Sequence, residues 1–232
     1  MTRKNPFAMI RPIIILTILL LAPIPLAAQE KSVNPGINKP FEKPKLEEWV
    51  ERFEGEGRDL YDHRHEAVEA CRIKPGMVVA DIGAGTGLFT RMFSALVGPK
   101  GKVYAVDISE EFIRHVEADG LNNVVGVVCQ PDSVNLPNSS IDLAFICDTY
   151  HHFEFPQKTM RSIHRALKPG GQVILIDFHK IKGRSTDWVM SHVRADQEVF
   201  TREIEEAGFR QVEEKDDLFK ESYFVRFEKV EE

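Results

Sequence analysis

The stretch VVADIGAGTGLFT, from Val78 to Thr90, decides how this chain is expected to fold. It begins with an apolar run that contains one acid, which is typical of a buried strand. Gly83, Gly85 and Gly87 then stand at every second position, and glycine allows a tight turn and the close approach of a ligand to the backbone. The end of the stretch is typical of the start of a helix. The sequence therefore predicts a strand, a glycine turn that holds a ligand, and a helix.

Beyond this stretch, apolar segments of strand length alternate with amphipathic segments of helix length. The expected strands are 77–82, 102–106, 124–129, 141–147, 172–178, 209–214 and 223–229. The expected helices are 86–96, 109–118 with Ser109 as N-cap, 156–167 and 196–207. This order predicts a doubly wound α/β sheet. The last strand alternates apolar and polar residues, as an antiparallel strand does.

The chain is expected to have three parts. Residues 1–28 contain a positively charged start, a short apolar run and a small-residue exit, which are the parts of a secretory signal peptide. We expect cleavage after Ala28, export to a bacterial periplasm and no stable membrane span afterwards; an uncleaved membrane anchor is the alternative. Residues 29–75 are expected to form a linker and an N-terminal helical lid, with helices at 46–53 and 59–71. Residues 76–232 are expected to form the main domain.

Composition limits the classes of partner. The 232 residues are 43% hydrophobic, which suits one sizeable core. The net charge is −6, and the lysines and arginines are scattered, which argues against nucleic acid as a partner. Cys71, Cys129 and Cys147 are too few and too irregular to form a disulfide framework. The composition gives no indication of the oligomeric state.

The glycine turn departs from the dinucleotide fingerprint G-x-G-x-x-G, because Leu88 stands where the third glycine is required. Asp81 precedes the turn, and a carboxylate there suits a cationic ligand better than a pyrophosphate. S-adenosylmethionine carries an ammonium and a sulfonium group and no phosphate. Asp107 ends the second strand, where it can accept hydrogen bonds from ribose hydroxyls, as also happens in nicotinamide enzymes. Asp132 follows the third strand, where it can accept from an adenine amino group.

Four segments carry a resemblance to a known family: VVADIGAGTG (78–87), VYAVDIS (103–109), SIDLAFICDTYHHF (140–153) and LKPGGQVILIDF (167–178). In this order they resemble the motifs of class I S-adenosylmethionine-dependent methyltransferases. The branch they most resemble is the small-molecule one that includes the ubiquinone/menaquinone-biosynthesis methyltransferases. The resemblance covers residues 74–232, and it implies a Rossmann-like seven-stranded sheet of order 3-2-1-4-5-7-6 with strand 7 antiparallel.

The resemblance also implies S-adenosyl-L-methionine as the cofactor and assigns residues to it. The methionine part is assigned to Asp81, Gly83, Ala84, Gly85, Thr86 and Gly87; the ribose to Asp107 and Ile108; and the adenine to Asp132 and Ser133. Gln130-Pro131 stands before Asp132 where relatives often have a glycine. Asp148 is assigned to the same site. Tyr61 and Arg64 are expected either to close over the cofactor carboxylate or to lie on a solvated helix surface.

His151 is the candidate general base, with His152 beside it, because histidine titrates near neutrality. The alternative is that both histidines point to solvent. His63-x-His65 and His151-His152 could suggest a metal, but no Cys or carboxylate cluster with ligand spacing accompanies them, so no metal site is expected. His179, Trp188 and Met190 are possible contacts of the acceptor.

The expected function is methyl transfer to a small-molecule acceptor by in-line displacement. The alternatives are a non-catalytic cofactor-binding protein of the same fold and, third, a nicotinamide-dependent oxidoreductase.

Overall fold

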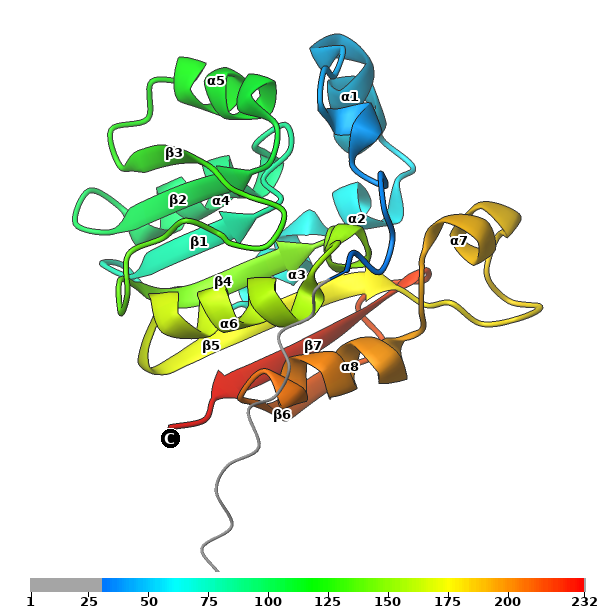
Figure 1. Cartoon of the computed structure of the whole chain (residues 1–232). Coiled ribbons are helices and arrows are strands. Elements are labelled where there is room, and N and C mark those ends of the chain that lie inside the picture. The colour runs from blue at the N-terminus through cyan, green and yellow to red at the C-terminus, as the bar shows by residue number, and fades with distance from the viewer. Residues whose placement is uncertain (1–30, 232) are drawn as a thin grey trace, which may run out of the picture.

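A computed structural model describes residues 31–231, and a seven-stranded sheet forms its centre (Figure 1). The strands are β1 (Val78–Ile82), β2 (Lys102–Asp107), β3 (Val124–Val128), β4 (Ile141–Cys147), β5 (Leu167–Phe178), β6 (Phe209–Lys215) and β7 (Ser222–Lys229). Their order is β3-β2-β1-β4-β5-β7-β6. β7 pairs antiparallel with both β5 and β6, and the other pairs are parallel. The predicted order and the antiparallel seventh strand are confirmed.

Helices cover both faces of the sheet. They are α1 (Leu46–Phe53), α2 (Asp59–Asp62), α3 (Arg64–Ala70), α4 (Leu88–Val97), α5 (Glu110–Ala118), α6 (Pro156–Ala166), α7 (Asp187–His192) and α8 (Gln197–Glu206), with short 3-10 turns η1 (Lys39–Phe41) and η2 (Tyr150–His152). α6 and α8 pack on one face, and α3 and α4 pack on the other (Figure 1). Successive residues of β4 enter opposite cores, since Ala144 and Ile146 face α6 whereas Leu143 and Phe145 face α4. This burial on both sides explains why every residue of the strand except Asp142, near its start, is apolar.

The strand order places the crevice of the sheet between β1 and β4. The side on which the next strand is added changes at this point. From β1 the chain continues to β2 on one side of the sheet, and from β4 it continues to β5 on the other. The paired ends are Ile82 and Ile146, so the loops that follow β1 and β4 lie side by side. Ligands of doubly wound sheets bind at such a switch point.

The N-terminal part differs from its prediction. The helix expected over 59–71 is two helices, because His63 leaves helical geometry at φ −101° and ψ 19°. Residues expected to be linker pack against the domain: Val33 N donates to Glu154 O at 2.9 Å, and the centre of the Phe41 ring lies 6.4 Å from that of Phe112. β5 also begins five residues before the expected start, at Leu167. The insert after β5 forms α7, a helix that was not expected.

The predicted signal peptide, residues 1–28, lies outside the described residues. Between residues 31 and 231, the structure has no helix that is both long and apolar enough to cross a bilayer.

Candidate active site

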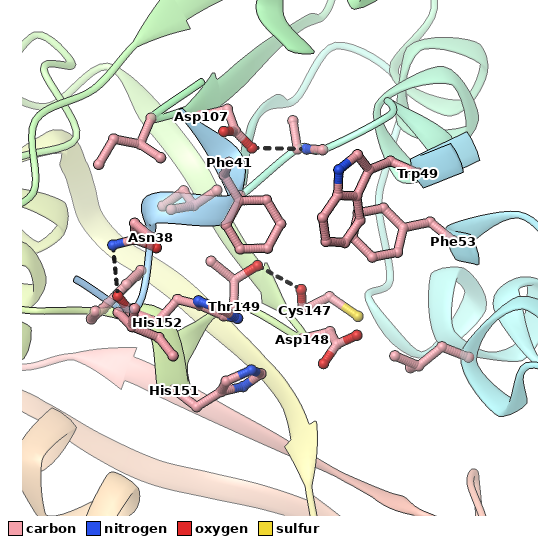
Figure 2. Close-up of a pocket in the computed structure, with 18 of the residues that line it drawn as sticks. Asn38, Phe41, Trp49, Phe53, Asp107, Cys147, Asp148, Thr149, His151 and His152 are labelled. Atoms are coloured by element: carbon pink, nitrogen blue, oxygen red, sulfur yellow. Dashed lines mark hydrogen bonds between the residues drawn. The ribbon is translucent and has the colours of Figure 1, made fainter. Parts of the chain in front are cut away.

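A cavity of about 570 Å³ opens at the carboxyl ends of β1, β2 and β4. Its volume lies within the range of small-molecule sites. The loops after these strands form its floor, the N-terminal segment (residues 31–60) covers one side, and α7 closes another. Figure 2 shows Phe41, Trp49 and Phe53 grouped together, with Asp107 at one end of the view and His151 at the other. Asp148 lies at the same end as His151.

The glycine turn after β1 has the backbone that its sequence predicts. Gly83, Gly85 and Gly87 all have positive φ, at 77°, 54° and 84°, a region that glycine enters without steric cost. The amides of Gly83 and Ala84 both donate to Val106 O, at 2.7 and 3.0 Å, which fastens the turn to β2. A Cβ at Gly83 would overlap the Thr149 side chain. Glycine is therefore needed here for the close approach of the loops after β1 and β4.

Not every residue of the turn faces the cavity. Gly83, Ala84, Gly85 and Thr86 line it, and Gly87 does not. A Cβ at Gly87 would meet Val116 Cγ2 at 2.8 Å. The third glycine thus serves the packing of α4 against α5.

Asp107 ends β2 and lines the cavity together with Ile108. Only 7% of the residue is exposed. Its carboxylate accepts from Gly85 N at 2.9 Å and from Ser109 N at 2.8 Å. Burial raises the pKa of Asp107, and these backbone donors oppose the shift. Asp107 thus joins the glycine turn to the start of α5, where Ser109 caps the helix as predicted.

Asp81 supports the site from behind. It is buried and is not among the residues that line the cavity. Thr90 Oγ1 donates to its carboxylate at 2.6 Å, linking β1 to α4. Burial raises the pKa of Asp81 to about 7, against the effect of the Thr90 hydrogen bond. The structure therefore differs from the expected direct contact of this side chain with a ligand.

The loop after β3 contributes other residues than expected. Asp132 and Ser133 do not line the cavity, whereas Cys129, Gln130 and Pro131 do. Gln130 N donates to Ser133 O at 2.9 Å, so the chain turns back at this point. Asp132 lies instead 3.5 Å from Lys158 Nζ. The departure at Gln130-Pro131 coincides with this turn.

The N-terminal segment is tied to the floor of the cavity by charged side chains. Glu54 pairs with Arg91 at 2.6 Å and accepts from Thr86 Oγ1 at 2.8 Å. Arg58 pairs with Asp148 at 2.5 Å. These two contacts connect the segment to the loops after β1 and β4.

Tyr61 and Arg64 are not placed at the cavity. The Arg64 guanidinium lies 4.1 Å above the Tyr61 ring and donates to the Tyr61 carbonyl. Two arginines of the N-terminal segment line the cavity instead, Arg52 on α1 and Arg58, which precedes α2. Sequence periodicity missed Arg58 because this residue lies outside the helical pattern.

Asp148 combines a strained backbone with an unsatisfied oxygen. Its φ is 52°, which is uncommon for a residue other than glycine. Oδ2 accepts from Arg58, while Oδ1 is buried without a hydrogen-bond partner. Burial raises the pKa of Asp148, and the Arg58 charge opposes this. A buried carboxylate oxygen of this kind fits a cationic group of a ligand.

His151 is held by an acid on the neighbouring strand. Its Nδ1 lies 2.8 Å from Asp177 Oδ1, and both side chains are buried. Burial lowers the pKa of His151, but the carboxylates of Asp177 and Asp148 together more than offset this, and the net shift is upward. Sequence analysis did not predict a role for Asp177, although this residue is the one acid in the apolar run 172–178.

Two further histidines meet His151. His152 Nε2 lies 3.3 Å from His192 Nε2, which comes from α7. Burial, together with the charges of its histidine neighbours, lowers the pKa of His152 to about 2. Trp188 lines the cavity as anticipated, whereas Met190 and His179 do not. His192 was not predicted, because nothing in its local sequence distinguishes it.

Comparison with known proteins places the chain among methyltransferases. Residues 80–175 match the family model described as a methyltransferase domain. The chain is 35% identical over 124 residues to the ubiquinone/menaquinone biosynthesis C-methyltransferase UbiE of Hydrogenovibrio crunogenus, covering 51% of this chain and 48% of the relative. The protein of the same name from a Shewanella species is 33% identical over 122 residues, with 50% and 48% covered. The chain thus spans about half the length of these curated relatives.

Solved structures agree with the fold. A SAM-dependent methyltransferase from Aquifex aeolicus has a TM-score of 0.70 at 25% identity, covering 81% of this chain and 100% of that one. The complex of the Haloferax volcanii Trm112 methyltransferase activator with its putative methyltransferase gives a TM-score of 0.66 at 14% identity, covering 86% of this chain and 100% of that one, which shows the fold alone. The predicted class I S-adenosylmethionine-dependent methyltransferase domain is confirmed, and S-adenosylmethionine is the cofactor that the family implies.

Proposed function

We propose that this class I methyltransferase domain transfers a methyl group from S-adenosylmethionine to a small-molecule acceptor by in-line displacement. One observation carries the proposal: a single cavity joins the glycine turn and Asp107 to the histidines after β4. The cofactor supplies an electrophilic methyl group on a sulfonium, which is a good leaving group. The chain has to bind the cofactor and the acceptor, orient them toward each other and exclude water. It needs no covalent nucleophile.

The residues at the turn fit the cofactor. The cavity side of Gly85 is open except for the Phe53 ring, which a Cβ would approach at 3.4 Å. Asp107 retains acceptor capacity for ribose hydroxyls beyond its two backbone donors, because an ionised carboxylate has about four lone-pair sites. The unpartnered Oδ1 of Asp148 suits the cofactor ammonium, and Arg58 suits its carboxylate.

The other end of the cavity suits a small acceptor with an apolar body. Phe178, Trp188 and Val189 line this end together with the histidines. The N-terminal segment lies over the cavity and is fixed by its contacts at Arg91 and Asp148, which disfavours a macromolecular acceptor. The relatives are named for C-methylation in quinone biosynthesis, and a ring-bearing small molecule is consistent with these walls.

We infer that His151 accepts a proton from the acceptor. Because Nδ1 faces Asp177 Oδ1, the carboxylate holds hydrogen on Nδ1 and leaves Nε2 as the acceptor nitrogen. A base positioned in this way contributes about 10²–10⁴-fold, whereas placement of the two reactants contributes about 7–11 kcal/mol. We therefore assign the larger share to placement.

Two titrations and one product assay test the proposal. The protein is titrated calorimetrically with S-adenosylmethionine and, separately, with NADH. It is then incubated with labelled S-adenosylmethionine and a panel of small-molecule acceptors, and S-adenosylhomocysteine is followed by mass spectrometry. We expect binding of S-adenosylmethionine alone and acceptor-dependent formation of S-adenosylhomocysteine. Binding of NADH alone would overturn the proposal in favour of an oxidoreductase. Cofactor binding without turnover on any acceptor would favour a non-catalytic binding protein.

A further inference from the structure

Three histidines meet in the cavity from elements that are far apart in the chain. His151 and His152 lie on η2, and His192 ends α7, forty residues beyond His152. One ligand nitrogen of each lies within 4.8 Å of the other two. We propose that His151, His152 and His192 hold a divalent transition-metal ion of the zinc type. Sequence spacing alone predicted no metal site, because only the fold brings the third histidine to the other two.

The measured separation fits a shared ion. Zinc binds imidazole nitrogen at about 2.0–2.1 Å in a tetrahedral arrangement, so two such nitrogens stand about 3.3–3.4 Å apart. His152 Nε2 and His192 Nε2 are 3.3 Å apart. A hydrogen bond between the two rings accounts for this distance as well. The ring of His151, which Asp177 holds, stands beside this pair, with its centroid 4.4 Å from that of His152 and 5.2 Å from that of His192.

Neighbouring side chains fix the orientation of each of the three histidine rings, as the neighbours of metal-binding histidines commonly do. Asp177 accepts from Nδ1 of His151 and thereby leaves Nε2 free to coordinate. A metal-bound Nε2 accepts no proton, so the role of His151 as a base applies to the metal-free protein. A carboxylate behind a ligating histidine fixes its tautomer and ring position. Trp188 stacks on His192 at 4.6 Å and an interplanar angle of 21°, and Phe41 meets His152 edge-on at 5.1 Å.

The charges near the cluster have both signs. The Arg52 guanidinium, 5.7 Å from the centre of the Trp188 ring, disfavours a dication. The buried carboxylate of Asp177 favours a dication. Its effect should be the stronger of the two, because Asp177 is in direct contact with the His151 ring.

Three protein ligands leave a fourth tetrahedral position, which catalytic zinc sites use for water or substrate. All three histidines line the cavity. An acceptor oxygen or sulfur at the fourth position would be held beside the transferable methyl group, and this role rests on the proposed function. Metal binding itself does not rest on it.

Metal binding is tested on the full chain without an affinity tag, after treatment with a chelator and dialysis. Zn²⁺ is titrated by calorimetry, and Co²⁺ by its visible absorption, which reports tetrahedral coordination. We expect one equivalent of tightly bound ion and tetrahedral Co²⁺ bands. Asp177→Asn should weaken binding by about 10–100-fold.

His192→Ala should abolish this stoichiometric binding. The matched control is His115→Ala on α5, outside the cluster, which should bind as the wild type does. Should His192→Ala prove unstable in thermal melts, His192→Gln replaces it. Wild-type binding no tighter than that of the His192 variant would overturn the proposal, as would equal loss in His115→Ala.

The same samples are titrated with S-adenosylmethionine. Intact cofactor binding without zinc binding would overturn the metal site and leave the proposed function standing. Zinc binding without cofactor binding would overturn the proposed function and leave the metal site standing.

Discussion

Asp107→Ala is the sharpest perturbation of the proposed cofactor site. The carboxylate accepts from Gly85 N at 2.9 Å and from Ser109 N at 2.8 Å, and it faces the cavity at the end of β2. Removing it takes away the expected partner of the ribose hydroxyls. It also leaves two backbone amides of the site without their acceptor.

The size of the effect follows from these contacts. Losing hydrogen bonds to a charged group costs about 1–3 kcal/mol of binding free energy. Since about 1.4 kcal/mol corresponds to a tenfold change, the dissociation constant of S-adenosylmethionine should rise about 5- to 150-fold. Each unpaired buried amide costs about 1–3 kcal/mol of folding free energy, and relief of the buried charge offsets part of this. Thermal unfolding should therefore show a destabilised but folded variant.

The matched control is Asp132→Ala, the same chemical change on the next loop of the sheet. The Asp132 side chain is 45% exposed, and it does not line the cavity. Calorimetric titration with S-adenosylmethionine should give the wild-type dissociation constant for this variant. Unchanged affinity in a folded Asp107→Ala protein would refute the placement of the ribose. Weakening by Asp132→Ala to a similar degree would show that the loop after β3 reaches the adenine, as the sequence alone predicted.

Three further outcomes are expected. Gly83→Ala should lower the melting temperature and the cofactor affinity far more than Gly170→Ala, because both glycines have positive φ but only the first meets a neighbour, the Thr149 side chain; equal melting temperatures would contradict the close-approach argument. Asp81 has a pKa of about 7 in the folded protein against about 3.9 when unfolded, so the folded state binds its proton more tightly and stability falls as pH rises from about 4 to about 7. Asp81→Asn cannot titrate and should gain stability relative to the wild type between pH 5 and pH 8 in urea unfolding without cofactor; a constant difference would count against the burial effect. Residues 1–28 should be absent from protein exported by a bacterial host, as read by N-terminal sequencing, and an intact N-terminus in the membrane fraction would instead support the uncleaved anchor.

Local sequence patterns predicted the parts of the molecule whose causes are local. The apolar run from Val78 and the glycines after it fixed a strand and a turn, because positive φ at three alternating positions is open to glycine at little cost. Ser109 was identified as a helix cap from its position alone, and its side chain accepts from Phe112 N. The strand order came from resemblance to a family, since periodicity does not reveal which strands are neighbours.

The direction in which an acid faces was decided by the tertiary structure. Asp81 and Asp107 both occur near the ends of apolar strands, yet only Asp107 faces the cavity, while Asp81 is covered by α4 and bonded to Thr90. Asp132 was expected at the site from its place after a strand, but the turn at Gln130 carries it away. These differences depend on packing between elements, and no local pattern contains that information.

The histidine cluster shows the same division most clearly. The sequence by itself determined that two adjacent histidines follow β4, at the edge where doubly wound sheets bind ligands. It did not determine that Asp177 of β5 would hold His151 or that His192 of α7 would reach His152. Those contacts exist because β4 and β5 pair in parallel and an insert after β5 folds back over their ends. Contacts between residues far apart in the chain are set by the closure of the whole fold, which is why only the tertiary structure decided them.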